Sequence, residues 1–507
     1  MAGVELTDAE LELMLPEAIQ NLRAYARLQE LPLANGVAPA VGFTPLLSGI
    51  GAEPWLPPDA ELRLPEARRP DDLEELAFAD IPTLAALIRS RQVSCVELTL
   101  TYLERLRRLD ESLLCVVTYT EERALAQAAR LDEELSQGHW RGPLHGIPWG
   151  AKDLLAVRGY RTTWGARPYE EQVLDLDAAV VRRLDEAGAV LIAKLTLGAL
   201  AMGDVWFGGK TRSPWNPEQG SSGSSAGSAA AVAGGGVAFA IGSETLGSIV
   251  SPSDRCGASS LRPTFGRVSR HGAMALSWSM DKLGPICRSV GDAALVFDAI
   301  AGPGEAGELD EVVDLPFAVP GEVDVRGWRV GYLAGAFERS ERLQHVLDEL
   351  RALEVELVPV ELPDYPVWEM MIILQAEAAT AFDELTRSGR DDLLVRQDAG
   401  AWPNSFRASR LIPAVEYIRA NRLRTLLCRE MHATMQEVDA LVHPSFGSAA
   451  LGIANLTGHP AVVAPAGFRE AGTPFSVTFT GRLYDEARLL ALAGAWQRGT
   501  AYHRRHP

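Results

Sequence analysis

The sequence predicts an α/β fold, with a mixed, largely parallel central β-sheet covered by helices on both faces. From Thr83 onwards, short apolar runs alternate with segments whose apolar residues have helical spacing. Alternation of this kind is typical of βαβ units, in which the strands are parallel. The chain has 507 residues, 47% of them hydrophobic, and this is enough to bury a large core.

The first half of this pattern contains strands expected at residues 114–119, 147–152 and 190–194. Helices are expected at residues 84–90, 96–109, 121–136 and 178–187. Ser94 is the expected N-cap of the second helix, because a serine hydroxyl can accept a hydrogen bond from an N–H group of the first turn.

The second half continues the alternation. Strands are expected at residues 328–333, 356–362, 440–443, 461–464 and 476–481, and helices at 341–353, 367–387, 415–438 and 486–497. A loop is expected around Asn404, between two of these helices. Residues 81–507 are therefore expected to form one domain with a helical insertion at about 365–438.

The first 80 residues differ in composition from the rest. A helix is expected to about Glu30, and the stretch from Pro32 to Pro82 then contains nine of the 31 prolines. Such a stretch should be extended and irregular, and should wrap a surface instead of forming its own core. Residues 1–80 are therefore interpreted as a helical and proline-rich N-terminal extension.

The chain is acidic, with a formal net charge of −19 at pH 7 and a pI of about 5.0. Nucleic acids and anionic membranes repel such a surface, so neither is expected as the main partner. The first residues lack the basic start and apolar run of a signal peptide, and no apolar stretch reaches 18 residues. We therefore expect a cytoplasmic location.

Cysteine and histidine usage gives no sign of a metal site. The five cysteines form no CxxC pair, and the nine histidines include no HExxH motif. An odd number of unclustered cysteines is typical of free thiols in a reducing compartment. We expect neither a metal nor another cofactor.

Residues 220–250 concentrate glycine, serine and alanine, and this segment has three interpretations. A flexible linker is disfavoured because residues 229–233 and 237–241 are apolar runs suited to burial. A phosphate-binding loop is disfavoured because no GK[ST] motif follows. The third interpretation is a nucleophile site, where small residues let backbone N–H groups approach a reacting carbonyl.

The same segment resembles the core of the amidase signature hydrolases, GGSSGGS followed by GxDxGGSIR. The chain has SGSSAGS at 222–228 and GSETLGSIV at 242–250, which places Ser224 and Ser248 24 positions apart, as in the family. The family motif G-[IV]-P-x-x-x-K-D is matched by GIPWGAKD at 146–153, which contains Lys152. With further matches in order, the resemblance covers roughly residues 80–500.

The resemblance implies a Ser-cisSer-Lys triad. Ser248 attacks the carbonyl, and Ser224, which follows a cis peptide bond in the family, relays the proton to Lys152. A serine hydroxyl is a weak nucleophile and needs a base. Lysine can act as that base only when neutral, so its pKa must fall from about 10.4 by roughly three units, a change of about 4 kcal/mol that burial can supply.

The same loop supplies the other groups expected at the site. The backbone N–H groups of Thr245, Leu246, Gly247 and Ser248 are the natural oxyanion hole. Ser225 and Ser243 are expected to support the network through hydrogen bonds.

Three residues depart from the family pattern: Leu246 replaces a glycine, Glu244 an aspartate and Val250 an arginine. Leucine would be strained at positive φ, so we expect position 246 to tolerate a side chain that projects towards the acyl pocket or the core. The changes at 244 and 250 are interpreted as loss of both partners of a polar pair, which leaves neither buried and unpaired.

The substrate pocket is expected to draw on Met202, Trp206, Trp278 and Phe446, which would favour an apolar or aromatic acyl group. We see in the sequence no positioned arginine and aspartate pair that would demand glutamine.

The favoured function is a free-standing amidase that acts through an acyl-enzyme on small-molecule amides, and the same chemistry extends to esters and carbamates. A homodimer is compatible with the sequence. The A subunit (glutaminase) of a tRNA-dependent amidotransferase, working in a complex, is the alternative. A third interpretation, a non-catalytic ligand-binding relative, is disfavoured because Lys152, Ser224 and Ser248 are intact.

Overall fold

The computed structural model describes residues 7–29, 35–37, 42–49, 51–58, 62–305, 308, 312–338 and 340–507. The main strands are β1 (Val116–Tyr119), β2 (Pro148–Lys152), β3 (Val190–Leu195), β8 (Phe239–Glu244), β9 (Ser259–Arg262), β10 (Lys282–Cys287), β11 (Arg329–Tyr332), β12 (Glu356–Pro359), β13 (Ala440–Pro444), β14 (Ala461–Phe468) and β15 (Pro474–Gly481). They form one 11-stranded sheet in the order β1-β3-β2-β8-β10-β9-β14-β15-β13-β11-β12.

The sheet is mixed, which confirms the predicted α/β class. Strands β3, β2 and β8 are parallel to one another, and so are β13, β11 and β12. The strands between these two groups pair antiparallel, as does the edge strand β1. The prediction of a largely parallel sheet is therefore wrong for the centre. Strands β14 and β15 show the reason, because a connection of only residues 469–473 allows a hairpin but no crossover.

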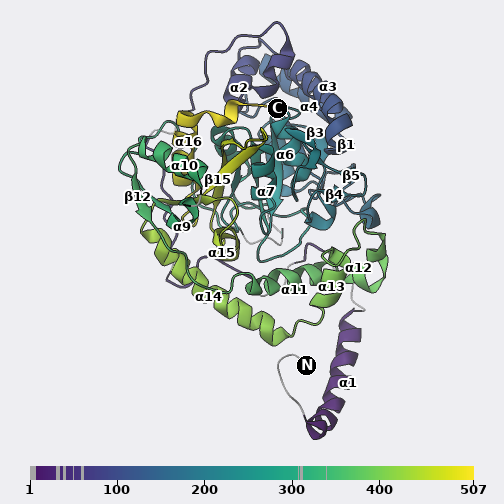
Figure 1. Cartoon of the computed structure of the whole chain (residues 1–507). Helices are drawn as coiled ribbons and strands as arrows, with labels where there is room; N and C mark the ends of the chain where they lie inside the picture. Colours follow the sequence, from purple (N-terminus) through teal and green to yellow (C-terminus); the bar gives the residue numbers. More distant parts are fainter. Residues whose placement is uncertain are drawn as a thin grey trace.

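The chain has helices around the sheet and one helix, α1, that lies apart from it (Figure 1). They are α1 (Asp8–Gln29), α2 (Ile81–Arg89), α3 (Cys95–Leu113), α4 (Glu121–Ser136), α5 (Ala179–Glu186), α6 (Ala226–Ala233), α7 (Val250–Cys256), α8 (Val290–Ile300), α9 (Ala334–Phe337), α10 (Glu341–Arg351), α11 (Ile372–Ala381), α12 (Asp383–Arg387), α13 (Trp402–Ser409), α14 (Ala414–Gln436), α15 (Ala450–Thr457) and α16 (Glu486–Thr500). Helices α6 and α7 pack together on the central strands, and α8 packs against β9, β10 and α16.

The predicted start of α3 is confirmed in detail. The Ser94 hydroxyl accepts a hydrogen bond from the Glu97 N–H at 3.1 Å, and the Glu97 carboxylate accepts one from the Ser94 N–H at 2.9 Å. This reciprocal pair satisfies two N–H groups that a helix start otherwise leaves without partners.

Between β12 and β13 the chain is mainly helical, and in Figure 1 α11 to α14 lie below the sheet and above α1. The loop expected around Asn404 is instead the helix α13. Pro403 stands in its first turn, where its missing N–H costs nothing. Trp402 and Phe406, one turn apart, stack at 4.9 Å and bury their rings in the core, which stabilises the helix.

The described parts of the N-terminal extension lie mostly against the rest of the chain. The Trp55 N–H donates to the Asp485 carboxylate at 2.9 Å, and the Trp55 ring meets Trp328 edge-on at 5.5 Å. Phe43 meets Phe265 edge-on at 5.2 Å. Helix α1 projects away from the body of the molecule (Figure 1).

Over the described ranges, none of the helices is both long enough and apolar enough to cross a bilayer.

Candidate active site

Two neighbouring parallel strands end side by side at the site. Strand β2 ends at Lys152 and β8 ends with Ser243 and Glu244, and the two strands pair with Ala151 opposite Ile241. Because the carboxyl ends of parallel strands lie at one edge of the sheet, this register brings Lys152 and Ser243 together. The Lys152 Nζ lies 2.8 Å from the Ser243 hydroxyl and 3.4 Å from the Ser243 carbonyl oxygen.

Ser224 and Ser225 stand immediately before α6. The peptide bond between Gly223 and Ser224 is cis, as the resemblance implies. Lys152 Nζ donates to the hydroxyl oxygens of Ser224 at 2.8 Å and Ser225 at 3.0 Å. The Ser225 hydroxyl also donates to the Ser243 carbonyl at 3.1 Å, so the three serines surround one amine.

Lys152 is fully buried among these oxygens. Burial lowers the pKa of Lys152 to about 7, although the carboxylates of Asp281 and Glu244 oppose this shift. A lysine with this pKa is about half neutral at neutral pH and can accept a proton through a hydroxyl in contact with it.

Ser248 lies in the loop that leads from β8 into α7 and is half-buried. Its carbonyl accepts a hydrogen bond from the Ser225 N–H at 3.1 Å, which ties this loop to the serines around Lys152. Gly247 has φ of +84°, a backbone conformation that side chains other than glycine rarely adopt. The chain therefore turns sharply just before Ser248, and the N–H groups of residues 245–248 lie in this turn.

Glu244 has a buried partner, contrary to the interpretation that a polar pair was lost. Its Oε1 lies 2.6 Å from the Arg262 guanidinium and accepts from the Asn455 amide at 2.9 Å. Its Oε2 accepts from the N–H groups of Ile249 and Val250 at 2.8 and 2.9 Å. Burial alone would raise the pKa of Glu244, but these partners, above all the charge of Arg262, hold it at about 2.

Arg262 of β9 therefore supplies the buried positive charge beside Glu244, and position 250 carries a valine. The Glu244 carboxylate accepts hydrogen bonds from the backbone N–H groups of the two residues directly after Ser248. These bonds fix the end of the loop.

Leu246 is half-buried and packs against the hydrophobic cluster that includes Met280 and Ile453. The residues described with positive φ do not include Leu246, so the leucine fits without backbone strain. Of the two directions expected for this side chain, the core is the one observed.

A cavity of about 590 Å³ has Ser243 and Thr245 in its wall, whereas Lys152, Ser224 and Ser248 do not line it. Much of the remaining wall is apolar and comes from Val37, Leu154, Trp164, Leu174, Leu176, Ala201, Met274, Leu276, Trp278 and Leu283. Trp278, one of the residues expected in the substrate pocket, lines this cavity. A cavity of this size and composition suits a small organic molecule with an apolar part.

The other expected pocket residues do not line this cavity. Met202 packs at the edge of the main core, and Trp206 is buried with its ring against Phe207 at 4.8 Å. Phe446 is 47% exposed. The cavity wall instead includes residues 35–37 of the N-terminal extension, for which no sequence motif provides a signal.

An arginine and an aspartate do meet at the cavity, although the sequence did not reveal such a pair. Arg270 and Asp281 both line it. Asp281 accepts hydrogen bonds from the Thr245 hydroxyl at 2.6 Å and from the N–H groups of Leu276 and Ser277 at 2.8 and 2.9 Å. Arg270 donates to the Trp278 carbonyl at 2.7 Å. Both charged groups are therefore engaged within the protein.

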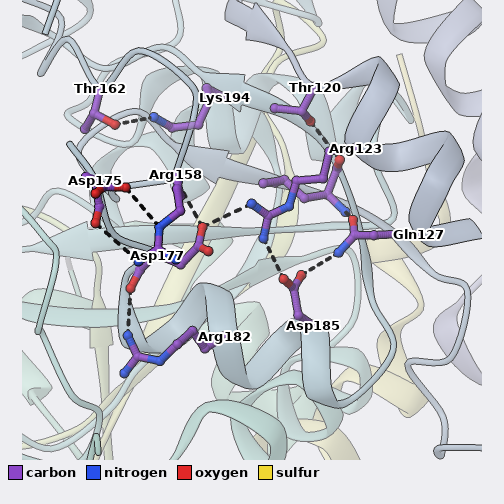
Figure 2. A network of polar contacts seen from close by, with 11 residues as sticks. Thr120, Arg123, Gln127, Arg158, Thr162, Asp175, Asp177, Arg182, Asp185 and Lys194 are labelled. Atoms are coloured by element: carbon purple, nitrogen blue, oxygen red, sulfur yellow. Dashed lines mark hydrogen bonds and ion pairs between the residues drawn. The ribbon is translucent and has the colours of Figure 1, made fainter. Parts of the chain in front are cut away.

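The segment between β2 and α5 supplies another part of the cavity wall. A network of hydrogen bonds and ion pairs joins this segment to α4 and α5 (Figure 2). The Arg123 guanidinium of α4 lies 3.1 Å from Asp177 and 2.5 Å from Asp185. Asp177 also accepts from the Arg158 N–H at 3.0 Å. These contacts hold both ends of the segment against α4 and α5.

A buried ion pair stands directly beside Lys152. The Lys194 ammonium of β3 lies 2.7 Å from the Asp153 carboxylate, and both side chains are 0% exposed. Lys194 also donates to the Thr162 hydroxyl at 3.0 Å (Figure 2). Burial lowers the pKa of Lys194, whereas Asp153 acts in the opposite direction. The pair fixes the backbone at the end of β2.

In the part of the chain that the structure describes, histidine, cysteine, aspartate and glutamate side chains form no group of three or more arranged to hold a metal ion. The five cysteines are free and buried.

Comparisons with known proteins agree with this architecture. The sequence profile of the amidase family matches residues 97–453. The A subunit of glutamyl-tRNA(Gln) amidotransferase from Roseiflexus sp. (strain RS-1) is 34% identical over 486 residues, which cover 86% of this chain and 98% of that protein.

Solved structures extend the likeness. The native peptide amidase from Stenotrophomonas maltophilia is 30% identical with a TM-score of 0.75, over 84% of this chain and 98% of that one. The A subunit of glutamyl-tRNA(Gln) amidotransferase from Thermotoga maritima is 26% identical with a TM-score of 0.70, over 87% of this chain and 98% of that one. The chain therefore belongs to the amidase signature family and is a hydrolase of amide C–N bonds.

Proposed function

We propose that this protein is an amidase that works through an acyl-enzyme on Ser248, with Ser224 as proton relay and Lys152 as base. The observation that carries the proposal is the buried Lys152 amine, with a pKa of about 7 and 2.8 Å from the Ser224 hydroxyl. A charged, solvated lysine could not accept a proton at neutral pH. Ser225 and Ser243 orient the amine by taking its other hydrogen bonds.

The reaction follows from these roles. The Ser248 oxygen forms a bond to the amide carbonyl carbon while its proton passes through Ser224 to Lys152. Negative charge develops on the carbonyl oxygen, and the N–H groups of Thr245, Leu246, Gly247 and Ser248 stabilise it.

The C–N bond then breaks, and the leaving nitrogen takes the proton back from Lys152 through Ser224. Water attacks the acyl-enzyme, gives a proton along the same route and releases the acid, which regenerates Ser248. An ester of the same acid gives the same acyl-enzyme, and an activated carbamate gives a carbamoyl-enzyme by the same attack, so both are expected substrates too.

The cavity beside Ser243 and Thr245 is the proposed acyl site. Its wall is mainly apolar, and Arg270 and Asp281 are engaged by protein groups. We therefore propose a small-molecule amide with an apolar or aromatic acyl group as substrate. Trp278 contacts that group, whereas Met202, Trp206 and Phe446 stand outside this cavity.

A panel of primary amides, esters and carbamates, tested with the purified protein alone, examines this proposal. We expect hydrolysis of amides with apolar acyl groups, and loss of kcat by about 10⁴-fold or more in Ser248→Ala. Ser136→Ala, an exposed serine at the end of α4, is the matched control and should behave as wild type. Wild-type turnover by Ser248→Ala would refute the proposal.

A second candidate is the A subunit of a tRNA-dependent amidotransferase. The likeness to such subunits at 34% identity favours it, and so does the presence of Arg270 and Asp281 at the cavity. In that case the protein alone would prefer glutamine over apolar amides, and it would bind partner subunits that engage tRNA. The same panel with glutamine included decides between the two, because an amidase of the first kind cleaves apolar amides without a partner.

We also propose a division of the chain into two parts. Residues 1–80 are an extension and residues 81–507 the catalytic domain, with its helical insertion at about 365–438. We propose that the enzyme works in the cytoplasm, without nucleic acid, membrane, metal or other cofactor, alone or as a homodimer. Light scattering of the purified protein, with and without tRNA, tests the oligomeric state and the absence of a nucleic-acid partner.

A further inference from the structure

We propose that Asn35, in the N-terminal extension, is a specificity-determining residue that holds one wall of the acyl cavity in place. The inference rests on the proposed function, because it assigns a role to the wall of that same site. Asn35, Gly36 and Val37 all line the cavity together with residues of the catalytic domain. The extension therefore supplies part of the surface that an acyl group would contact.

Asn35 is bound to the domain by a reciprocal pair of hydrogen bonds. Its Oδ1 accepts from the Ala275 N–H at 2.6 Å, and its Nδ2 donates to the Ala275 carbonyl at 2.9 Å. The Trp278 indole N–H donates to the Asn35 carbonyl at 3.2 Å. Only a side chain with a donor and an acceptor on the same short amide can make the pair with Ala275.

These bonds join the extension to residues 270–281, which themselves form much of the cavity wall. Asn35 Nδ2 also lies 3.5 Å from the carbonyl of Ala381, at the end of α11. One side chain thus connects three separate stretches of the chain around the cavity.

Phe43 of the extension is a second contact that connects to residues 270–281. The Arg424 guanidinium lies over the Phe43 ring at 3.4 Å and donates to the Ser279 hydroxyl and carbonyl at 3.0 and 2.8 Å. Ser279 is also bound by the buried Glu377 carboxylate, which accepts from its hydroxyl at 2.7 Å. The stretch that Asn35 contacts is therefore also held at Ser279, by side chains of α11 and α14.

The wall is also linked to the reacting groups. Asp281 ends the stretch that Asn35 contacts, and its carboxylate holds the Thr245 hydroxyl at 2.6 Å. Asn35 itself bonds to Ala275, Trp278 and Ala381, which place it against the cavity wall and away from the hydrogen bonds of Lys152. Loss of the Asn35 contacts should therefore weaken binding of acyl groups large enough to reach this wall more than it weakens the chemical step.

The test uses full-length protein and primary amides, which all release ammonia, so that only the acyl group varies. The panel runs from acetamide through hexanamide to benzamide and 2-naphthamide. For Asn35→Ala we expect kcat/KM to fall about tenfold on 2-naphthamide, mainly through KM, and about twofold or less on acetamide. The aspartate in Asn35→Asp has the same shape but lacks the N–H donor. Its kcat/KM should therefore also fall more on 2-naphthamide than on acetamide.

Asn404→Ala is the matched control, because Asn404 also hydrogen-bonds to backbone carbonyls and does not line the cavity. It should leave the whole panel unchanged, and circular dichroism should show all variants folded. Equal losses across the panel, or none, for both Asn35 variants would overturn the inference while amide hydrolysis by wild type still stands. If wild type cleaves no amide, the proposed function itself has failed, and this inference fails with it.

Discussion

The side-chain nitrogen of Lys152 and the hydroxyl oxygen of Ser243 lie 2.8 Å apart at the ends of two neighbouring parallel strands. Neither residue is close to the other in sequence, and the register of β2 with β8 alone brings them together. The contact places an amine with a lowered pKa one hydrogen bond behind the wall of the proposed acyl cavity, since Ser243 forms part of that wall.

The rate should depend on pH through Lys152. Below its pKa of about 7 the amine is protonated and cannot accept the proton of Ser248, so kcat/KM should fall tenfold per pH unit. Above about pH 8 the value of kcat/KM should reach a plateau. Profiles of kcat/KM from pH 5 to 9.5 measure this, with Lys210→Ala, an exposed lysine, as the control that keeps the same profile. A rate that keeps rising to pH 9.5 would mean that the base is a lysine with an ordinary pKa.

Removal of the Ser243 hydroxyl should slow the chemical step. Ser243→Ala takes away one of the hydrogen bonds that orient Lys152, and a hydrogen bond to a group that becomes charged is worth about 1.5–3 kcal/mol. We therefore expect kcat to fall by about 10- to 100-fold with little change in KM. Steady-state kinetics on one amide measure both constants. A rise in KM alone would assign Ser243 to substrate binding instead.

The buried pair of Glu244 and Arg262 should be essential for stability. Glu244→Gln leaves the Arg262 charge buried without a counter-charge, which costs about 3–5 kcal/mol. The thermal unfolding temperature should fall by several degrees, and kcat should fall as well, because Glu244 holds the two residues after Ser248. Asp324→Asn, which breaks an exposed pair with Arg326, is the control and should have almost no effect. Equal unfolding temperatures for the two variants would contradict this role.

The ion pair beside Lys152 allows a test by double substitution. Lys194→Met leaves the Asp153 carboxylate buried without its charge partner, and should lower the unfolding temperature strongly. Adding Asp153→Asn removes the unpaired charge, so the double variant should unfold at a higher temperature than Lys194→Met alone. Differential scanning fluorimetry gives this order. A double variant less stable than either single variant would show that the unpaired Asp153 charge is not what destabilises Lys194→Met.

Much of the fold follows from local sequence patterns. The helix at 121–136 has the expected limits, and the strand expected at 147–152 begins one residue later, at Pro148, because each is one amphipathic or largely apolar run. The helix at Asn404 was missed because its stability comes from Trp402 and Phe406 packing into a core formed by distant residues. The antiparallel centre of the sheet was missed because pairing depends on which strands meet in space.

In the candidate site, too, some residues could be predicted from the sequence and others could not. The resemblance of two motifs to those of the amidase signature hydrolases selected Lys152, Ser224 and Ser248, and the structure places the Lys152 amine 2.8 Å from the Ser224 hydroxyl. The partner of Glu244 could not be found this way, since Arg262 lies on another strand and only the sheet brings it near. Likewise, nothing local to Asn35 indicates that it reaches Ala275, 240 positions away.

The most direct test of the account is the position of the acyl group on the enzyme during turnover. Incubation with an activated aryl ester of a bulky acid, or with an activated aryl carbamate, should increase the mass of the intact protein by one acyl or carbamoyl group, and peptide mapping should place that group on Ser248. Ser136→Ala should be acylated like wild type, and Ser248→Ala should not. An acyl group on any other residue, or full acylation of Ser248→Ala, would contradict the account.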